Sequence, residues 1–226
     1  MPEETGEIKR RVLLVDDHPI VRHGLGLLID QEDDLVVCGE TESAVETLDN
    51  VDDMAPDVVV VDISLRGSNG LELTKVLKDT RPELPILVLS MHDESLYAER
   101  ALRCGARGYV MKQEAADTVL KAIRKVIGGG IYLSERLSTK MLREFTDGNK
   151  VEGDKFGIES LSDRELEVFE LIGRGHSTRV IAERLRLSVK TIETHRAHVK
   201  QKLKLNNATE LVHRAFHWVE NGETDH

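Results

Sequence analysis

Residues 12–17 read VLLVDD, a run of aliphatic residues that ends in two adjacent aspartates. A second run of this kind, VVVVD at residues 58–62, also ends in an aspartate. Uninterrupted apolar runs of this length are typical of strands buried on both faces, as in a parallel sheet covered by helices. The two stretches therefore predict central strands that carry acidic residues at their carboxyl ends.

The chain around these runs alternates strand patterns with helix patterns. The predicted strands are Val12–Asp16, Leu35–Cys38, Asp57–Asp62, Ile86–Ser90 and Gly108–Met111. The spacing of Leu, Ile, Val and Ala predicts helices over residues 20–30, 42–53, 70–79, 95–103 and 115–127. Such βα units predict an α/β fold, a doubly wound five-stranded parallel sheet of order 2-1-3-4-5 with helices on both faces.

The strand patterns stop after the three glycines at residues 128–130. We predict a first domain over residues 1–130 and a linker over residues 131–157, which contains polar sequence and a helix pattern near residues 135–145. The remaining residues, 158–226, show only helix patterns. They predict a second domain that is all-α.

The composition fits a globular protein without a membrane span. Hydrophobic residues make up 40% and charged residues 32% of the 226 residues. No apolar run approaches the roughly 20 residues that a membrane helix needs, and the charged start does not read as a signal peptide. We therefore expect a cytoplasmic protein. Cys38 and Cys104 are predicted to be small core residues, and neither a disulfide framework nor a zinc site is expected.

The net charge of −10 is concentrated in the first half of the chain. Residues 1–131 contain 15 basic and 25 acidic side chains, whereas residues 132–226 contain 16 of each. Within residues 174–204 there are nine basic side chains and only two acidic ones. A locally basic segment of this kind is suited to face the phosphates of a nucleic acid.

Carboxylate, hydroxyl and amine groups stand at the ends of the predicted strands. Asp16 and Asp17 mark the end of the first strand, Asp62 the third and Ser90 the fourth, and Lys112 follows the fifth. Ligands of open α/β sheets bind at this edge, where strands 1 and 3 are neighbours in the predicted order. Three carboxylates brought together repel one another, so a cation is expected among them. Because oxygen ligands select a hard ion, Mg²⁺ is the predicted cofactor.

These groups predict phosphoryl chemistry centred on Asp62. With Mg²⁺ bound, the Asp62 carboxylate can attack phosphorus while the Lys112 ammonium neutralises the transferring oxygens. The Ser90 hydroxyl can then donate to the phosphoryl group and draw its loop inward, and Tyr109 can move into the vacated space. Each residue alone also fits an ordinary turn, surface or core position. The alternative for the whole set is a phosphoryl-transfer enzyme with a small-molecule substrate.

The second domain contains the pattern of a helix-turn-helix. Ser162 and Glu165 form an S-x-x-E capping box, residues 177–188 (STRVIAERLRLS) predict a short helix and turn, and Ser188 caps a second helix. The residues predicted to face outward from that helix and to bind DNA are Lys190, Thr191, Glu193, Thr194, Arg196, Ala197, His198 and Lys200.

Different DNA contacts are expected from different members of this set. The cations of Lys190, Arg196 and Lys200 suit phosphates, and Glu193, Thr194 and Ala197 suit base edges in the major groove. An ordinary charged surface on a helical bundle, as in an adaptor that binds proteins rather than DNA, is the alternative. It leaves the basic second helix unexplained.

Residues 10–128 resemble the CheY-like receiver domain of response regulators, through VLLVDD, VVVVD, ILVLS and GYVMK. The resemblance implies that Asp62 is the phospho-acceptor and that Ser90, Tyr109 and Lys112 are switch and phosphate-binding residues. It also implies a set of Mg²⁺ ligands, namely Asp16, Asp17, Asp62 and the backbone carbonyl of Ser64. A receiver is not an enzyme with its own substrate, and only slow autophosphatase chemistry is expected.

Residues 158–221 resemble the LuxR-type DNA-binding domain, through LSDRELEVFELIGRG, IAERL and LSVKTIETHRAHVKQKL. A receiver followed by this domain is the arrangement of the NarL/FixJ class of response regulators. The resemblance implies a transcription factor that a sensor histidine kinase phosphorylates on Asp62, which controls sequence-specific DNA binding. The last helix pattern resembles one often used for dimerisation on DNA. The implied partners are the kinase, double-stranded DNA, RNA polymerase and a second copy of the chain.

Overall fold

The computed structural model describes residues 9–146, 155–158 and 160–223. The chain forms two compact units, Met1–Ser134 and Glu135–His226. In the described residues, no helix is long and apolar enough to cross a membrane.

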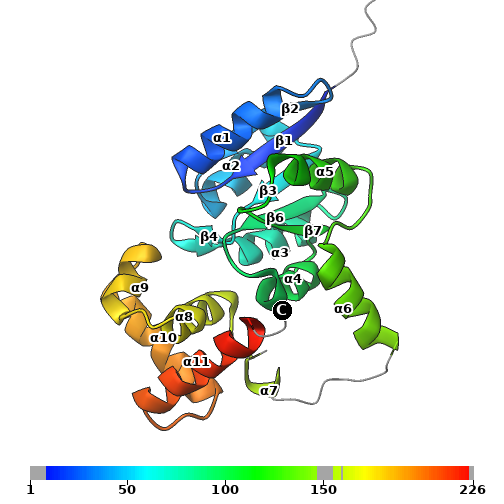
Figure 1. Cartoon of the computed structure of the whole chain (residues 1–226). Coiled ribbons are helices and arrows are strands. Elements are labelled where there is room, and N and C mark those ends of the chain that lie inside the picture. The colour runs from blue at the N-terminus through cyan, green and yellow to red at the C-terminus, as the bar shows by residue number, and fades with distance from the viewer. Residues whose placement is uncertain (1–8, 147–154, 159, 224–226) are drawn as a thin grey trace, which may run out of the picture. The chain divides into compact units, whose positions relative to one another are not determined.

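The first unit is built around a five-stranded parallel sheet (Figure 1). The main strands are β1 (Arg10–Val15), β2 (Leu35–Thr41), β3 (Val58–Val61), β6 (Ile86–Ser90) and β7 (Gly108–Met111). Their order is β2-β1-β3-β6-β7, which is 2-1-3-4-5 when only the main sheet is counted. The predicted α/β fold class is therefore confirmed.

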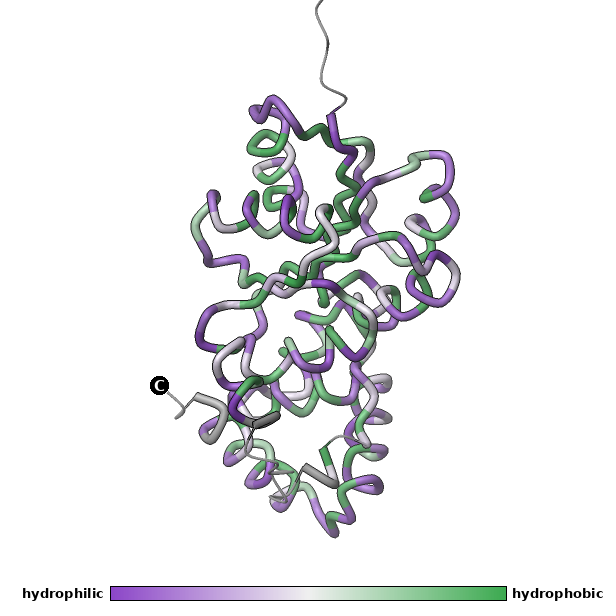
Figure 2. The backbone as a smooth tube through the Cα atoms, turned by 90° about the vertical axis from the view of Figure 1, so that its right-hand side faces the viewer, coloured by the Kyte–Doolittle hydropathy of each residue, from purple (hydrophilic) through white to green (hydrophobic). Residues whose placement is uncertain are grey.

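Helices cover both faces of this sheet. They are α1 (Pro19–Asp30), α2 (Ala44–Met54), α3 (Gly70–Thr80), α4 (Glu94–Arg103) and α5 (Ala116–Ile127). Alternate residues of β1 enter two different cores, because successive strand side chains point to opposite faces. Val12 and Leu14 pack with residues of α1 and α5, whereas Leu13 and Val15 pack with residues of α2 and α3. Figure 2 shows the hydrophobic residues concentrated along the strands.

A short hairpin follows β3 and was not predicted from the sequence. It pairs β4 (Ser64–Leu65) with β5 (Ser68–Asn69) in antiparallel register. Gly67 turns the hairpin with a φ of 72°, a conformation that favours glycine. Strands of two residues are too short to produce a periodic pattern, so only the folded chain reveals them.

The second unit is all-α, as predicted. Its helices are α6 (Glu135–Thr146), α7 (Lys155–Ile158), α8 (Asp163–Gly173), α9 (Thr178–Arg184), α10 (Val189–Lys202) and α11 (Ala208–Glu223). The helix pattern near residues 135–145 corresponds to α6, whereas α7 was not predicted. Residues 147–154 of the predicted linker lie outside the described residues.

Serine caps determine where the central helices of this unit begin. Ser162 accepts a hydrogen bond from the backbone N–H of Glu165, whose carboxylate accepts one from the Ser162 N–H, so the predicted capping box is present. Ser177 caps α9 and Ser188 caps α10 in the same way. At the other end of α8, a side chain on Gly173 would overlap with the Ala215 carbonyl oxygen, so a glycine lets α8 and α11 approach closely.

The two cysteines depart from the expectation of core positions. Cys38 and Cys104 do not form a disulfide, and both are only half-buried. Cys38 packs against the core formed by α2 and α3, and burial raises the pKa of its thiol.

Gly70 offers a test of how tightly the chain packs beside Asp62. A Cβ at Gly70 would overlap with the Asp62 carbonyl oxygen. We expect Gly70→Ala to lower the free energy of unfolding by about 1–3 kcal/mol, because the backbone must move to relieve the overlap. The control is Gly24→Ala in α1, where a Cβ meets nothing within 4 Å. Denaturant unfolding compares the two, and equal stability of both variants would contradict the packing argument.

Candidate functional site

Three aspartates converge at the carboxyl ends of neighbouring strands. Asp16 and Asp17 follow β1, Asp62 follows β3, and the three residues are only 4–6% exposed. One ligand atom from each, together with a ring nitrogen of His18, lies within a 4.8 Å span. The predicted adjacency of the three acids is therefore present in the structure. A buried acidic cluster of this kind is typical of a Mg²⁺ site.

Lys112, directly after β7, lies between two of these carboxylates. Its Nζ atom is 2.6 Å from Asp16 Oδ2 and 2.7 Å from Asp62 Oδ2. Burial raises the pKa of Asp62, against the opposing effect of the Lys112 ammonium. Burial alone would lower the pKa of Lys112, but the Asp62 and Asp16 carboxylates outweigh it and raise that pKa. The lysine is thus held as a cation inside the site.

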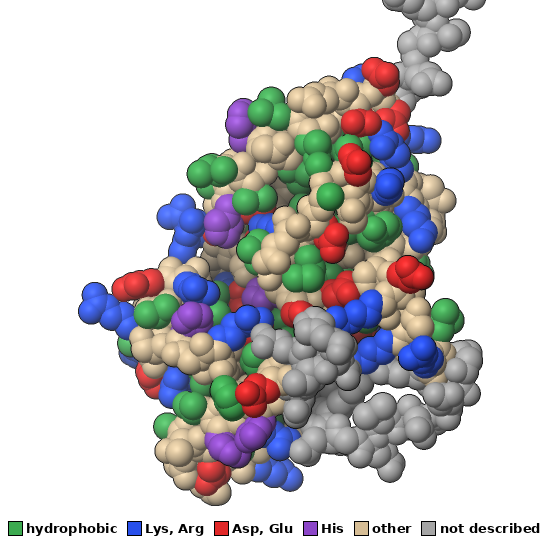
Figure 3. Space-filling view, in the orientation of Figure 1, with side chains coloured by type: hydrophobic (Ala, Val, Ile, Leu, Met, Phe, Trp, Pro, Cys, Tyr) green, Lys and Arg blue, Asp and Glu red, His purple; other side chains and the backbone are tan. Residues whose placement is uncertain are grey.

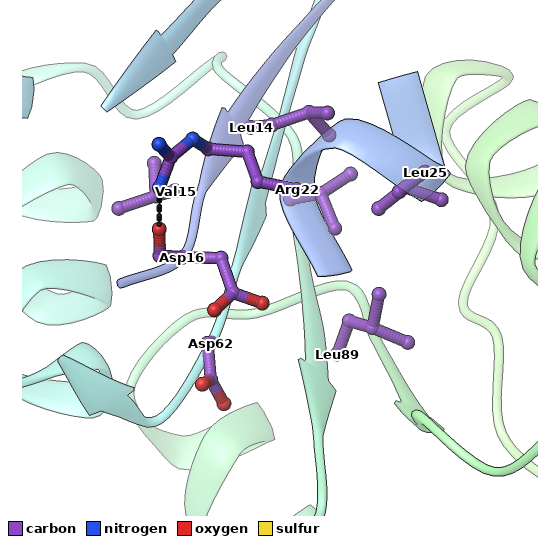
Figure 4. A pocket seen from close by; sticks show the side chains of 8 residues that line it. Leu14, Val15, Asp16, Arg22, Leu25, Asp62 and Leu89 are labelled. Carbon is purple, nitrogen blue, oxygen red and sulfur yellow. Dashed lines mark hydrogen bonds between the residues drawn. The ribbon is translucent and has the colours of Figure 1, made fainter. Parts of the chain in front are cut away.

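Arg22 in α1 holds the end of β1 in place, and the sequence analysis did not identify it. Its guanidinium donates to the Asp16 carbonyl oxygen at 2.6 Å, as Figure 4 shows, while the Asp16 carboxylate lies beside Asp62. The same side chain donates to Glu40 at 2.9 Å and to Glu42 at 3.0 Å. Because Glu40 is in β2 and Glu42 follows it, the contacts join non-local segments that no short motif marks.

His18 is a second residue that the sequence analysis missed. It stands at the N-cap of α1, and its backbone N–H donates to Asp16 Oδ1 at 2.8 Å. Its Nδ1 atom is 2.8 Å from Asp17 Oδ1 and 3.9 Å from Asp62 Oδ2. The imidazole is half-exposed, so it lies at the rim of the acidic cluster. Its position directly after the aspartate pair was the available sequence signal.

The remaining predicted switch residues meet at His92, which was also missed. The Ser90 hydroxyl accepts from the His92 N–H at 3.3 Å, and the Tyr109 hydroxyl donates to the His92 carbonyl at 2.8 Å. The Nε2 atom of the His92 ring lies 3.0 Å from the Ser64 hydroxyl oxygen. Ser90 and Tyr109 are fully buried, so the tyrosine already occupies an inward position. The segments that follow β3 and β6 are thereby joined to β7.

The residues predicted to bind DNA lie on α10 with unequal exposure. Those exposed to solvent are Lys190, Glu193, Thr194, Ala197 and His198, and those half-buried are Thr191, Arg196 and Lys200. The inward face contains Ile192 and Val199, which are both fully buried. The Arg196 side chain is only 16% exposed and lies 3.8 Å from Glu193. Among the predicted phosphate ligands, Lys190 is exposed, whereas Arg196 and Lys200 are half-buried.

Glu165 anchors α10 to α8. Besides completing the capping box, its carboxylate is 2.6 Å from Lys202 Nζ and 3.6 Å from His198 Nδ1. Burial would raise the pKa of Glu165, but hydrogen bonds from Lys202 and Ser162 hold it below its ordinary value. Lys and Arg side chains also gather over the neighbouring helix α9 (Figure 3). Glu165 thus holds the end of α10 against the start of α8.

Each of the two units matches a known protein family. Residues 12–124 match the response regulator receiver domain, and residues 159–215 match the bacterial regulatory proteins of the luxR family. The oxygen regulatory protein NreC of Staphylococcus carnosus is 36% identical over 212 residues, which cover 91% of this chain and 96% of that protein.

The chain is also similar to solved structures of response regulators. The structure of RcsB from Salmonella enterica serovar Typhimurium bound to promoter rprA is 27% identical, with a TM-score of 0.58 and coverage of 91% of this chain and 97% of that one. A LuxR-family two-component response regulator from Aurantimonas is 33% identical with a TM-score of 0.57, and covers 61% of this chain and 99% of that one.

The two domain matches occur in the order predicted from the sequence, and the similarity to NreC extends over nearly the full length of both proteins. The family consists of transcription regulators rather than enzymes. The chain therefore belongs to the NarL family of two-component response regulators, DNA-binding transcription factors in which a receiver domain precedes a LuxR-type domain.

Proposed function

We propose that a sensor histidine kinase phosphorylates Asp62 and that this phosphorylation controls sequence-specific DNA binding by the second unit. The observation that supports this most directly is the Lys112 ammonium, which lies within 2.7 Å of both Asp16 and Asp62 at the carboxyl edge of the sheet. A lysine in this position can neutralise charge on a phosphoryl group attached to Asp62.

The donor atoms of the acidic cluster fit a magnesium ion. Asp16, Asp17 and Asp62 supply buried carboxylate oxygens within a span of 4.8 Å, and the backbone carbonyl of Ser64 is the proposed fourth protein ligand. Mg²⁺ bound there would neutralise charge on the oxygens of the transferring phosphoryl group. The carboxylates would hold the ion, and Arg22 would keep the end of β1 in position.

In the proposed transfer, an Asp62 carboxylate oxygen forms a bond to phosphorus while the bond from phosphorus to the kinase histidine nitrogen breaks. The electron pair of the broken bond remains with the departing imidazole. The Ser90 hydroxyl, which accepts from the His92 N–H, can donate its own proton to a phosphoryl oxygen. This new bond would alter the segment that Tyr109 holds through the His92 carbonyl.

For the second unit, we propose that α10 enters the major groove of DNA. The solvent-exposed cation of Lys190 stands in the first turn of the helix, with Lys200 farther along it, and both are placed to contact phosphates. Glu193, Thr194 and Ala197 lie exposed between them and can approach base edges. Arg196, Thr191 and His198 complete the proposed surface. Binding as a homodimer would read two half-sites, with RNA polymerase as a further partner in the cytoplasm.

Magnesium binding is expected to stabilise the first unit through the acidic cluster. At a concentration about 100 times its Kd, Mg²⁺ should stabilise the folded state by about 2.7 kcal/mol. Asp17→Asn should remove most of this effect, whereas Asp33→Asn, which changes an exposed acid outside the cluster, should retain it. Thermal unfolding with and without MgCl2 provides the measurement. If Asp17→Asn and wild type responded equally, Asp17 would not be a ligand.

Phosphorylation is expected at one site and only with the metal present. Acetyl phosphate with Mg²⁺ should add the mass of one phosphoryl group to the wild-type chain, and EDTA should prevent the addition. Asp62→Asn should remain unlabelled because it lacks the nucleophilic carboxylate. Intact-mass spectrometry checks both results, and equal labelling of Asp62→Asn would overturn the assignment.

DNA binding is expected to depend on salt and on α10. Lys190→Ala should reduce the slope of log affinity against log salt by about one, because one phosphate contact is lost. The charge-matched control is Lys75→Ala, an exposed residue of α3. Fluorescence anisotropy with a labelled random-sequence duplex gives the slopes. An unchanged slope for Lys190→Ala, or an equal change for Lys75→Ala, would place the phosphate contacts elsewhere.

A further inference from the structure

The final helix carries two adjacent histidines that neither the phosphorylation site nor the proposed DNA surface uses. His213 and His217 are separated by one helical turn of α11, and both are exposed. Their Nε2 atoms lie 3.0 Å apart, and the ring centroids are 4.3 Å apart. Figure 3 shows histidine side chains gathered on the surface of α11.

The backbone beneath this pair is held by the opposite face of α11. Leu211, Ala215 and Val219 are buried, and the Trp218 ring packs 5.6 Å from the ring of Phe169 in α8. The exposed imidazoles therefore project from a helix that tertiary packing already fixes. Little conformational entropy has to be lost to bring the two nitrogens to one ligand.

The separation of the two nitrogens fits a shared metal ion. Nitrogen ligands lie about 2.0–2.1 Å from Zn²⁺, so two of them on one tetrahedral ion are roughly 3.3 Å apart. The observed 3.0 Å is close to that value. Imidazole is a preferred ligand of zinc, copper and nickel, whereas Mg²⁺ prefers oxygen. The chemistry of this pair is thus distinct from that of the acidic cluster.

We propose that His213 and His217 form a chelating site for a divalent late transition-metal cation of the nickel, copper and zinc class. Among the described residues, three or more His, Cys, Asp or Glu side chains converge only at the acidic cluster around Asp62. The pair on α11 therefore has no third protein ligand of these types beside it. Water or an exchangeable outside ligand would therefore fill the remaining coordination positions. The proposal departs from the sequence-based expectation that the chain has no zinc site.

The test is a calorimetric titration of the untagged full chain with Ni²⁺, in a large excess of Mg²⁺ that competes for the acidic cluster. Wild type should bind one more equivalent of Ni²⁺ than His217→Ala or His213→Ala. Binding by either variant at α11 should be at least about tenfold weaker, because the second imidazole acts as an intramolecular ligand. The double variant should also lack this equivalent of Ni²⁺.

Two controls separate chelation from other effects. His23→Ala removes an exposed histidine from α1 and should leave the Ni²⁺ stoichiometry of wild type unchanged. The His217→Ala variant should unfold at the wild-type temperature without metal, and His217→Gln should also lose the site. Equal Ni²⁺ stoichiometry and affinity in wild type and both His217 variants would overturn the proposal.

Discussion

The contact of the Lys112 ammonium with Asp16 and Asp62 is the interaction on which the first unit depends. Three carboxylates buried at the end of two neighbouring strands would repel one another in a medium of low dielectric. The lysine at the end of β7 offsets this repulsion at 2.6 and 2.7 Å. It thereby joins the ends of β1, β3 and β7, which belong to distant parts of the chain. The cluster that these contacts complete is the site proposed above for a cation and a phosphoryl group.

A change of charge at Asp62 can reach several segments because His92 connects them. Its side chain contacts Ser64 after β3, its N–H contacts Ser90 at the end of β6, and its carbonyl accepts from Tyr109 in β7. Each contact is a single hydrogen bond of modest net free energy. In the proposed switch, a small set of such bonds would be exchanged for bonds to the phosphoryl group while the core stays folded. The buried sheet provides the rigid frame, and the polar edge provides the part that can rearrange.

In the second unit, the buried carboxylate of Glu165 joins two helices. It completes the N-terminal cap of α8 and pairs with Lys202 of α10, so the start of one helix sets the orientation of another. Ile192 and Val199 occupy the buried face of α10, which leaves its polar face outward. The surface proposed to bind DNA is therefore a consequence of how α10 is anchored.

By itself, the sequence determined the α/β class, the main strands, the all-α second unit and the identity of the acidic and lysine groups. It did so because buried parallel strands, amphipathic helices and serine caps leave short-range patterns. Tertiary structure alone decided the β4–β5 hairpin, the contacts of Arg22 with β2, the central place of His92 and the low exposure of Arg196. The contacts of Arg22 and His92 join residues distant in sequence, whereas the β4–β5 hairpin is local but too short to leave a periodic pattern. No local pattern encodes the contacts of Arg22 and His92, since each depends on which segments the folded sheet and helices bring together.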